Sequence, residues 1–142
     1  MKRLVIILSV FAVMIGFAVV DLLYTNSTYR LLEEGLIKVE KSIATYLESE
    51  NGTIDNDTHN ENGRKIILSQ IEKVENQWNK RRRGMQMLTH HTIIRSMDER
   101  LTSMFFQIRV GNYQDAVVTL HALKGWIADL KVENHVLLEN VF

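Results

Sequence analysis

Apolar positions change along this chain from a nearly continuous run at the start to a regular spacing further on. The run covers residues 4–20, and Leu22, Leu23 and Tyr24 extend it past Asp21. As a helix of about 1.5 Å per residue, residues 4–24 are long enough for the bilayer hydrocarbon core of about 30 Å. The start of the chain therefore predicts either a membrane-spanning helix over residues 1–24 or a signal peptide.

The residues that follow this leader decide between the two. Gly16, Phe17 and Ala18 would serve passably as a cleavage motif, so removal of the leader stays an alternative. Directly after it, however, apolar residues recur at spacings of three and four, as on one face of an amphipathic helix. They are Tyr29, Leu32, Leu36, Val39, Ile43 and Tyr46. A helix that leaves the membrane without a linker favours a retained anchor.

Charge near the leader predicts its orientation. Lys2 and Arg3 form the only dense basic cluster beside the run in sequence. Because basic flanks stay in the cytoplasm, we expect a single-pass protein of the cell membrane, with a cytoplasmic N-terminus and an extracytoplasmic body over residues 25–142.

The body divides into four helical patterns. The first covers about residues 25–49 and ends in a run of Asn, Asp, Glu and Gly that predicts a polar loop over residues 49–63. A second helix starts near Arg64 and carries Ile67, Ile71, Val74 and Trp78 on one face until Gly84, which we expect to end or bend it. The third has a broad apolar face: Met87, Leu88, His91, Ile94, Met97, Leu101, Met104, Phe105 and Ile108.

Capping signals separate the third pattern from the fourth. Gly111 stands where a left-handed C-terminal cap is expected, and Asn112 with Asp115 three residues later resembles an N-terminal cap. The fourth helix has this apolar face: Tyr113, Ala116, Val117, Leu120, Leu123, Ile127 and Leu130. The last residues, from Lys131 to Phe142, lack a clear helical spacing, and we expect an extended tail packed on the bundle.

Four helices with one apolar face each predict an all-α fold, in which the membrane helix continues into a small antiparallel bundle. The absence of Pro from the chain agrees with long helices. The chain has no Cys, which excludes disulfides and thiolate chemistry. Its formal net charge is zero, so composition does not indicate a nucleic-acid surface.

Two clusters raise the question of chemistry. His90 and His91 suggest a metal site with Asp98 or other histidines, but adjacent helical residues point about 100° apart and rarely bind one ion together. We instead expect one histidine in the core and the other in solvent. The basic run at residues 80–83 could meet lipid headgroups or an acidic partner, yet a solvated helix end is the simpler interpretation. We expect neither a catalytic centre nor a cofactor.

The C-terminal half resembles an uncharacterised family of small single-pass membrane proteins from spore-forming Gram-positive bacteria, which share a domain of unknown function. The resemblance rests on the order of Trp78, the segment "LTHHTIIRSMDERL", the segment "GNYQDAVVTLHALKGWI" and the closing "LLENVF". It implies a helical domain outside the membrane and no activity. The candidate structural or interaction positions are Trp78, His91, Leu101, Asn140 and Phe142.

Three functions remain open at this point. A membrane-anchored scaffold or accessory protein that acts by protein contact fits best, because an anchor joins an amphipathic helix and no active-site motif is found. A small-molecule sensor bundle that signals through a partner chain is the alternative. An enzyme would rest on the histidines alone. The lipid bilayer is the expected partner of residues 4–24, and pairing with a second copy through the seam of residues 25–49 stays open.

Overall fold

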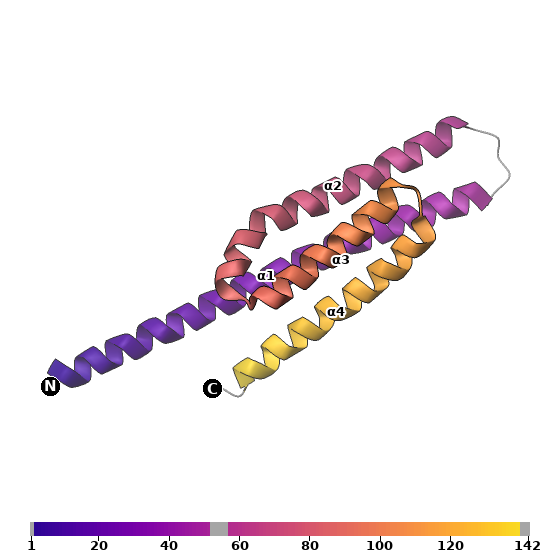
Figure 1. Cartoon of the computed structure of the whole chain (residues 1–142). Coiled ribbons are helices and arrows are strands. Elements are labelled where there is room, and N and C mark those ends of the chain that lie inside the picture. The colour runs from indigo at the N-terminus through magenta and orange to yellow at the C-terminus, as the bar shows by residue number, and fades with distance from the viewer. Residues whose placement is uncertain (1, 52–56, 140–142) are drawn as a thin grey trace.

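The computed structural model describes residues 2–51 and 57–139, and all regular structure in these two ranges is helical. Four helices follow one another, α1 (Lys2–Asn51), α2 (Asp57–Leu88), α3 (His91–Arg109) and α4 (Tyr113–Glu139). Figure 1 shows α1 as one long rod, and the other three helices lie along the half of it that is farther from the N-terminus. The predicted all-α fold, with an apolar first helix that continues into a bundle, is confirmed.

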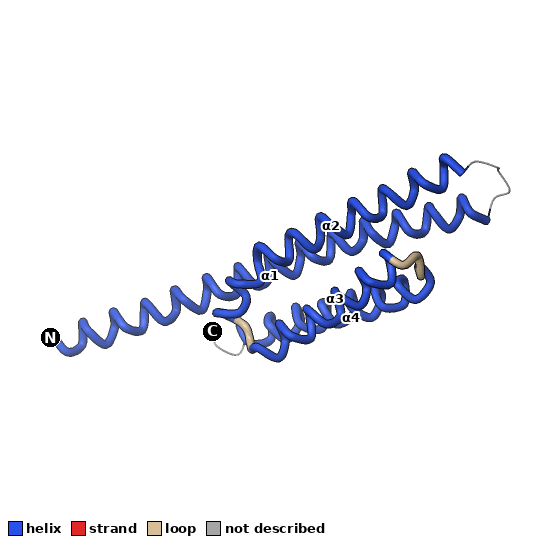
Figure 2. The backbone as a smooth tube through the Cα atoms, turned by 45° about the horizontal axis from the view of Figure 1, so that its top comes forward, coloured by secondary structure: helices blue, strands red, loops and turns tan. Residues whose placement is uncertain are grey.

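The helices pack in cyclic order. The backbones of α1 and α2, α2 and α3, α3 and α4, and α4 and α1 lie close together, while among the described residues those of the diagonal pairs do not. Successive helices run in opposite directions, as Figure 2 shows, which is the arrangement of an up-and-down four-helix bundle. The apolar seam after the leader is the α1 contribution to the core.

The core contains the apolar faces expected from the spacing. Leu36, Val39 and Ile43 from α1 have no exposed surface, and Leu101 from α3 is 1% exposed. From α4 the buried side chains are Tyr113, Ala116, Leu120, Leu123, Ile127 and Leu130. Burying one such aliphatic side chain stabilises the fold by roughly 1.5–3 kcal/mol, so the seam of α1 finds its main partner inside the chain.

The first part of α1 has a different environment. A window of this helix reaches a mean hydropathy of 2.7 with none of its residues buried, which makes α1 long and apolar enough to cross a membrane. Such a helix near an N-terminus is typical of an anchor and also of a signal sequence. From Asp21 onward the side chains begin to be covered by the bundle, and no break separates the two parts of the helix.

The turn between α3 and α4 confirms the capping signals. Gly111 has φ +84°, and the amide of Asn112 donates to the carbonyl of Gln107 at 2.9 Å, which closes a Schellman motif. The side chain of Asn112 then accepts from the amide of Asp115 at 3.4 Å. Both helix ends could be predicted because the capping residues are close together in the sequence.

Other helix boundaries differ from expectation. The polar segment predicted as a loop over residues 49–63 is helical at 49–51 and at 57–63, because α1 and α2 continue beyond the other helices as a two-helix hairpin. A hairpin without neighbours needs little apolar surface, so its sequence is polar. Gly84 does not end α2, which runs four residues further to Leu88. Figure 1 shows that the last turns of α2 bend toward α1, which agrees with the other alternative, a bent helix.

The third and fourth patterns also need correction. Met87 belongs to α2 and is 87% exposed, so it is not part of the apolar face of the third helix. The extended tail predicted after residue 130 is wrong, because α4 continues to Glu139 along α1. A bridge of 2.7 Å from Lys131 to Glu33 holds this extension to its neighbour. Asn140 and Phe142 lie outside the described residues.

Candidate functional site

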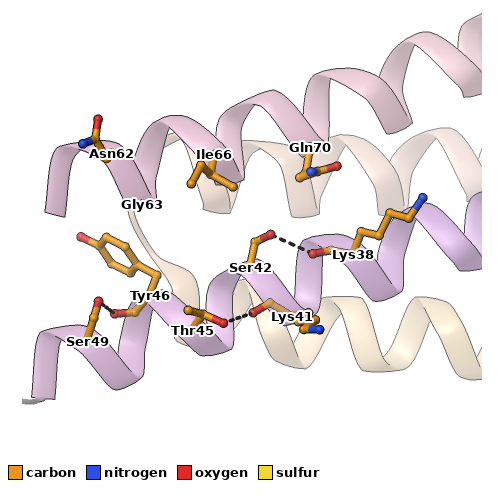
Figure 3. Close-up of a pocket in the computed structure, with 10 residues that line it drawn as sticks. All are labelled: Lys38, Lys41, Ser42, Thr45, Tyr46, Ser49, Asn62, Gly63, Ile66 and Gln70. Atoms are coloured by element: carbon orange, nitrogen blue, oxygen red, sulfur yellow. Dashed lines mark hydrogen bonds between the residues drawn. The ribbon is translucent and has the colours of Figure 1, made fainter. Parts of the chain in front are cut away.

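A groove opens between α1 and α2 near the end of the hairpin that is farthest from the anchor (Figure 3). It has a volume of about 540 Å³. Its lining comes from about three turns of α1 and about two and a half turns of α2. The lining residues are Lys38, Lys41, Ser42, Thr45, Tyr46 and Ser49 from α1, and Asn62, Gly63, Ile66 and Gln70 from α2. We call this the distal groove.

Tyr46 forms the inner wall of the distal groove. A Cβ atom on Gly63 would lie 2.7 Å from Cδ2 of the Tyr46 ring, so the absence of a side chain at position 63 lets the ring lie against α2. The ring centroids of Tyr46 and Tyr113 are 4.9 Å apart and tilted by 56°, a favourable aromatic contact. The wall is thus braced by the first residue of α4.

The serine and threonine hydroxyl groups in the groove donate to carbonyls of their own helix. Ser42 donates to the carbonyl of Lys38 at 2.9 Å, and Thr45 donates to the carbonyl of Lys41 at 3.0 Å (Figure 3). These hydroxyls are therefore poor candidates for a nucleophile. No group of three or more acidic or histidine side chains among the described residues could hold a metal ion.

The chemical character of the distal groove comes from Lys38, Lys41 and Ile66. Both lysines are exposed and have no ion pair among the described residues, and Ile66 is 55% exposed. A groove that carries an exposed aliphatic side chain on α2 and two unpaired ammonium groups on α1 suits an amphipathic, acidic surface of another protein. Sequence reasoning missed this groove, because its residues come from two segments that are mostly polar.

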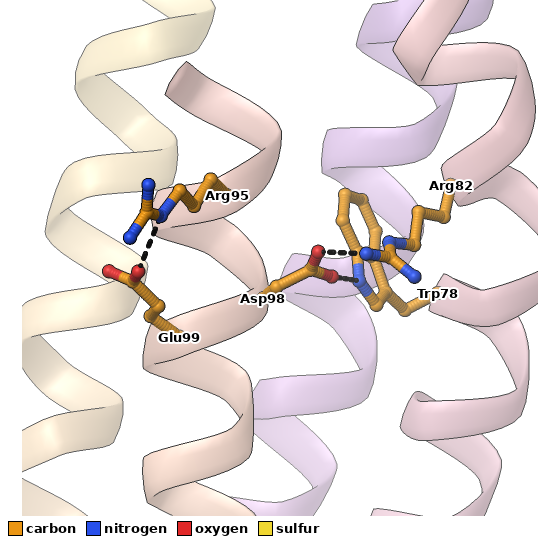
Figure 4. Close-up of polar contacts among 5 residues, drawn as sticks. All are labelled: Trp78, Arg82, Arg95, Asp98 and Glu99. Atoms are coloured by element: carbon orange, nitrogen blue, oxygen red, sulfur yellow. Dashed lines mark hydrogen bonds and ion pairs between the residues drawn. The ribbon is translucent and has the colours of Figure 1, made fainter. Parts of the chain in front are cut away.

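A second polar cluster lies between α2 and α3 (Figure 4). Trp78 is 3% exposed, and its indole Nε1 donates to Oδ1 of Asp98 at 2.7 Å. The other oxygen of Asp98 accepts from Arg82 at 2.6 Å. One turn away, Arg95 and Glu99 form an exposed pair within α3 at 2.9 Å, which contributes little to stability. Since Asp98 is occupied on both oxygens, this cluster joins two helices and has no free acid for chemistry.

The histidines do not form a site. His90 and His91 are both exposed, at the start of α3, so the prediction that one of them lies in the core is wrong. The physical reason is that α3 begins only at His91, and its first core residue is Ile94. The Nδ1 atom of His90 lies 2.8 Å from the hydroxyl of Thr92. Leu101 and Trp78 lie in the core, and the structure does not bring His91 to them.

The basic run at residues 80–83 is not a helix end, since α2 continues to Leu88. Arg81 lies over the ring of Tyr24, 5.1 Å from its centroid, and Arg82 is paired with Asp98. Lys80 and Arg83 are exposed and unpaired among the described residues. The run therefore lies beside the last residue of the apolar leader. The sequence alone does not show this, because the two segments are 57 residues apart.

A third charged cluster links α1 and α4. Glu40 accepts from Lys124 at 2.6 Å and also contacts His121. The hydrogen bond from Lys124 is the main reason why the pKa of Glu40 is lowered, while partial burial opposes this effect and His121 adds to it. Glu40 is thus an ionised clamp between two helices.

No protein-family model matches this chain, and no similar protein is found among curated proteins or solved structures.

Proposed function

We propose that this protein is a membrane-anchored scaffold or accessory subunit, whose helical domain stands outside the cytoplasmic membrane and binds another protein through the distal groove. The observation that carries the proposal is the continuity of α1, which passes from an exposed apolar segment into the bundle core without a break. A continuous helix transmits the orientation of the anchor to the bundle. The groove is thereby held at a set height above the bilayer.

The height follows from helix geometry. From Tyr24 to Tyr46 the helix rises about 33 Å at 1.5 Å per residue. A partner that binds the groove must therefore reach about 33 Å from the end of the leader. It would be either a protein located at that distance from the membrane or another membrane protein with an external domain of that height. Lys38 and Lys41 favour an acidic surface on that partner, and Ile66 favours an apolar side chain at its centre.

Two further observations support this assignment. The core of the bundle is filled by its own aliphatic, aromatic and methionine side chains, which agrees with a role in binding at the surface. The resemblance to small single-pass membrane proteins without known activity points to the same class. The orientation with the N-terminus in the cytoplasm rests on the basic residues before the anchor.

The proposal can be tested with a photoreactive amino acid placed at Ile66 in the full-length protein in living cells. We expect a covalent adduct with one envelope protein, and we expect Lys41→Glu to weaken it. The matched control is the same amino acid at Val118, which is 68% exposed on α4 and away from the groove. Equal labelling at both positions, or none at Ile66, would contradict the proposed docking site.

A small-molecule sensor is the second candidate, favoured by the size of the groove. Its volume of about 540 Å³ lies within the range of roughly 300–1,000 Å³ that is usual for ligand sites. A sensor of this kind would bind a small anion with an apolar part and pass the signal to a partner chain. A panel of such anions should then raise the melting temperature of the wild type but not of Lys41→Glu.

A further inference from the structure

The end of the bundle nearest the leader carries a surface that the distal groove does not explain. Lys80, Arg83 and Met87 are spaced by three and four residues and so share one face of α2. All three are exposed, and Met87, at 87%, is the most exposed large apolar side chain of the described residues. We call these three residues the basal face.

The height of this face follows from the contact between α2 and the leader. Tyr24, the last residue of the apolar run, donates a hydrogen bond of 3.2 Å to the carbonyl of Arg81. Its ring also lies against Gly84, where an added Cβ would be 2.5 Å from the hydroxyl. These two contacts place residues 81–84 of α2 beside the end of the leader.

From there α2 runs only four residues further, to Leu88, and Figure 1 shows its last turns bending toward α1, at the end of the bundle nearest the leader. The three residues from Gly84 to Met87 add a rise of about 4.5 Å at most, so Met87 lies within about one helical turn of the level of Tyr24. When residues 4–24 fill a hydrocarbon core of about 30 Å, Met87 is level with the boundary between headgroups and acyl chains.

The end of α2 and the start of α3 carry positive charge and no negative charge. Residues 80–91 include four Lys or Arg and no Asp or Glu. Arg81 and Arg82 are engaged by Tyr24 and Asp98, which leaves Lys80 and Arg83 free to meet anions. Two carboxylates of α1 and α4, Asp21 and Glu133, lie close enough to Tyr29 to raise the pKa of its phenol.

We propose that the basal face is a second membrane contact, in which Lys80 and Arg83 bind the phosphates of anionic phospholipids and Met87 enters the acyl-chain boundary. The proposal rests on the anchoring of α1 proposed above. Long basic side chains beside an apolar one are suited to an interface, because their stems cover apolar surface while the charged ends reach the phosphates. This contact would fix the tilt of the bundle, and hence the direction in which the distal groove faces.

The Cys-free chain allows a direct test in the full-length protein. Single Cys residues replace Met87, Phe11 in the leader and Val118 on the bundle surface, and each carries a nitroxide spin label. The variants are reconstituted in bilayers of phosphatidylcholine alone or mixed with phosphatidylglycerol. The accessibility of each label to oxygen, which concentrates in lipid, and to a water-soluble nickel chelate reports its depth.

We expect the label at Met87 to lie at the headgroup boundary in the anionic bilayers and to be more water-accessible in phosphatidylcholine. Each basic side chain contributes a factor of about five to binding an anionic surface. The charge reversal K80E/R83E should therefore lower the equilibrium constant for contact by at least about 25-fold. The control K65E/K73E changes the net charge by the same amount at exposed positions of α2 farther from the leader, and it should leave the label unchanged.

Three results decide the outcome. A label at Met87 that is equally aqueous in all bilayers, while the label at Phe11 is in lipid, overturns the basal contact and leaves the anchor intact. An aqueous label at Phe11 overturns the anchor itself. A label at Met87 that is hidden from both oxygen and the chelate indicates a protein contact in place of lipid, and this also overturns the proposal.

Discussion

A close approach between α1 and α2 depends on a small residue, Gly35. A Cβ atom there would lie 2.7 Å from Cγ2 of Val74, a β-branched and buried side chain with little freedom to move. A Cβ atom added at Gly63 would similarly lie too close to Tyr46, and one added at Gly84 would lie too close to Tyr24. Glycine therefore sets the distance between the two helices along their whole contact.

This contact predicts opposite effects for two identical substitutions. Gly35→Ala should lower the free energy of unfolding by about 1–3 kcal/mol, because the clash exceeds the gain in helix propensity of up to about 1 kcal/mol. Gly125→Ala on α4 has no neighbour within 4 Å and should instead stabilise the protein by about 0.5–1 kcal/mol. Chemical denaturation of both variants, followed by circular dichroism, measures the difference. A Gly35→Ala protein as stable as Gly125→Ala would refute the packing described here.

Tyr29 predicts how the fold responds to alkali. Burial, with smaller contributions from the carboxylates of Asp21 and Glu133, raises the pKa of its phenol from 10.0 to about 12. Because the pKa is higher in the folded state, the neutral phenol contributes stability that is complete below pH 10 and is lost as the pH rises toward 12. Thermal unfolding between pH 9 and about pH 12 should show this loss in the wild type. In Tyr29→Phe the slope over the same interval should be smaller, and an unchanged slope would contradict the assignment.

At the scale of elements, the contacts of Glu40 on α1 with Lys124 and His121 on α4 predict how the stability of the protein changes in acid. The pKa of Glu40 is lowered, so its stabilising effect is present above the ordinary glutamate pKa of 4.5 and disappears as the pH falls through the lower folded value. The pair is partly exposed, so we expect Glu40→Gln to cost at most about 1 kcal/mol at neutral pH. The difference from wild type should vanish in strong acid. A difference that is the same at all pH values would mean that Glu40 acts through packing.

The helices that could be predicted from the sequence are those with local signals. The turn at Gly111 and Asn112 has its capping residues side by side, and the α4 face repeats without interruption, so both agreed with the structure. The end of α2 was missed because Gly84 looks like a helix breaker. Its role depends on Tyr24, which is 60 residues away in sequence.

The candidate sites were less accessible to prediction than the fold. Trp78 was expected in the core. Its hydrogen bond to Asp98 could not be predicted, because the spacing of apolar residues describes one helix at a time and this bond joins two helices. The distal groove is lined mostly by polar residues, which a hydrophobic pattern assigns to solvent. Its wall arises only when Tyr46, Gly63 and Tyr113 meet. A surface that two helices form together can be recognised only when the fold shows which of their residues lie side by side.

For the whole molecule, the burial of the α1 seam predicts that the bundle does not need a second copy. Leu36 and Ile43 have no exposed surface, whereas Lys38 between them is exposed. Single Cys residues at Leu36 and Ile43 should therefore give no efficient disulfide dimers when intact membranes are oxidised. Efficient dimers at these two positions, but not at Lys38, would contradict the monomeric bundle and make pairing of two copies the working model.

The central claim is that the apolar part of α1 stays attached and holds the bundle to the membrane. The most direct measurement is the intact mass and N-terminal sequence of the protein recovered from membranes of the producing cells after an alkaline wash. We expect it in the membrane pellet with residues 4–24 present. A soluble product that begins near Val19, after the motif Gly16-Phe17-Ala18, would contradict the account and make the leader a signal peptide.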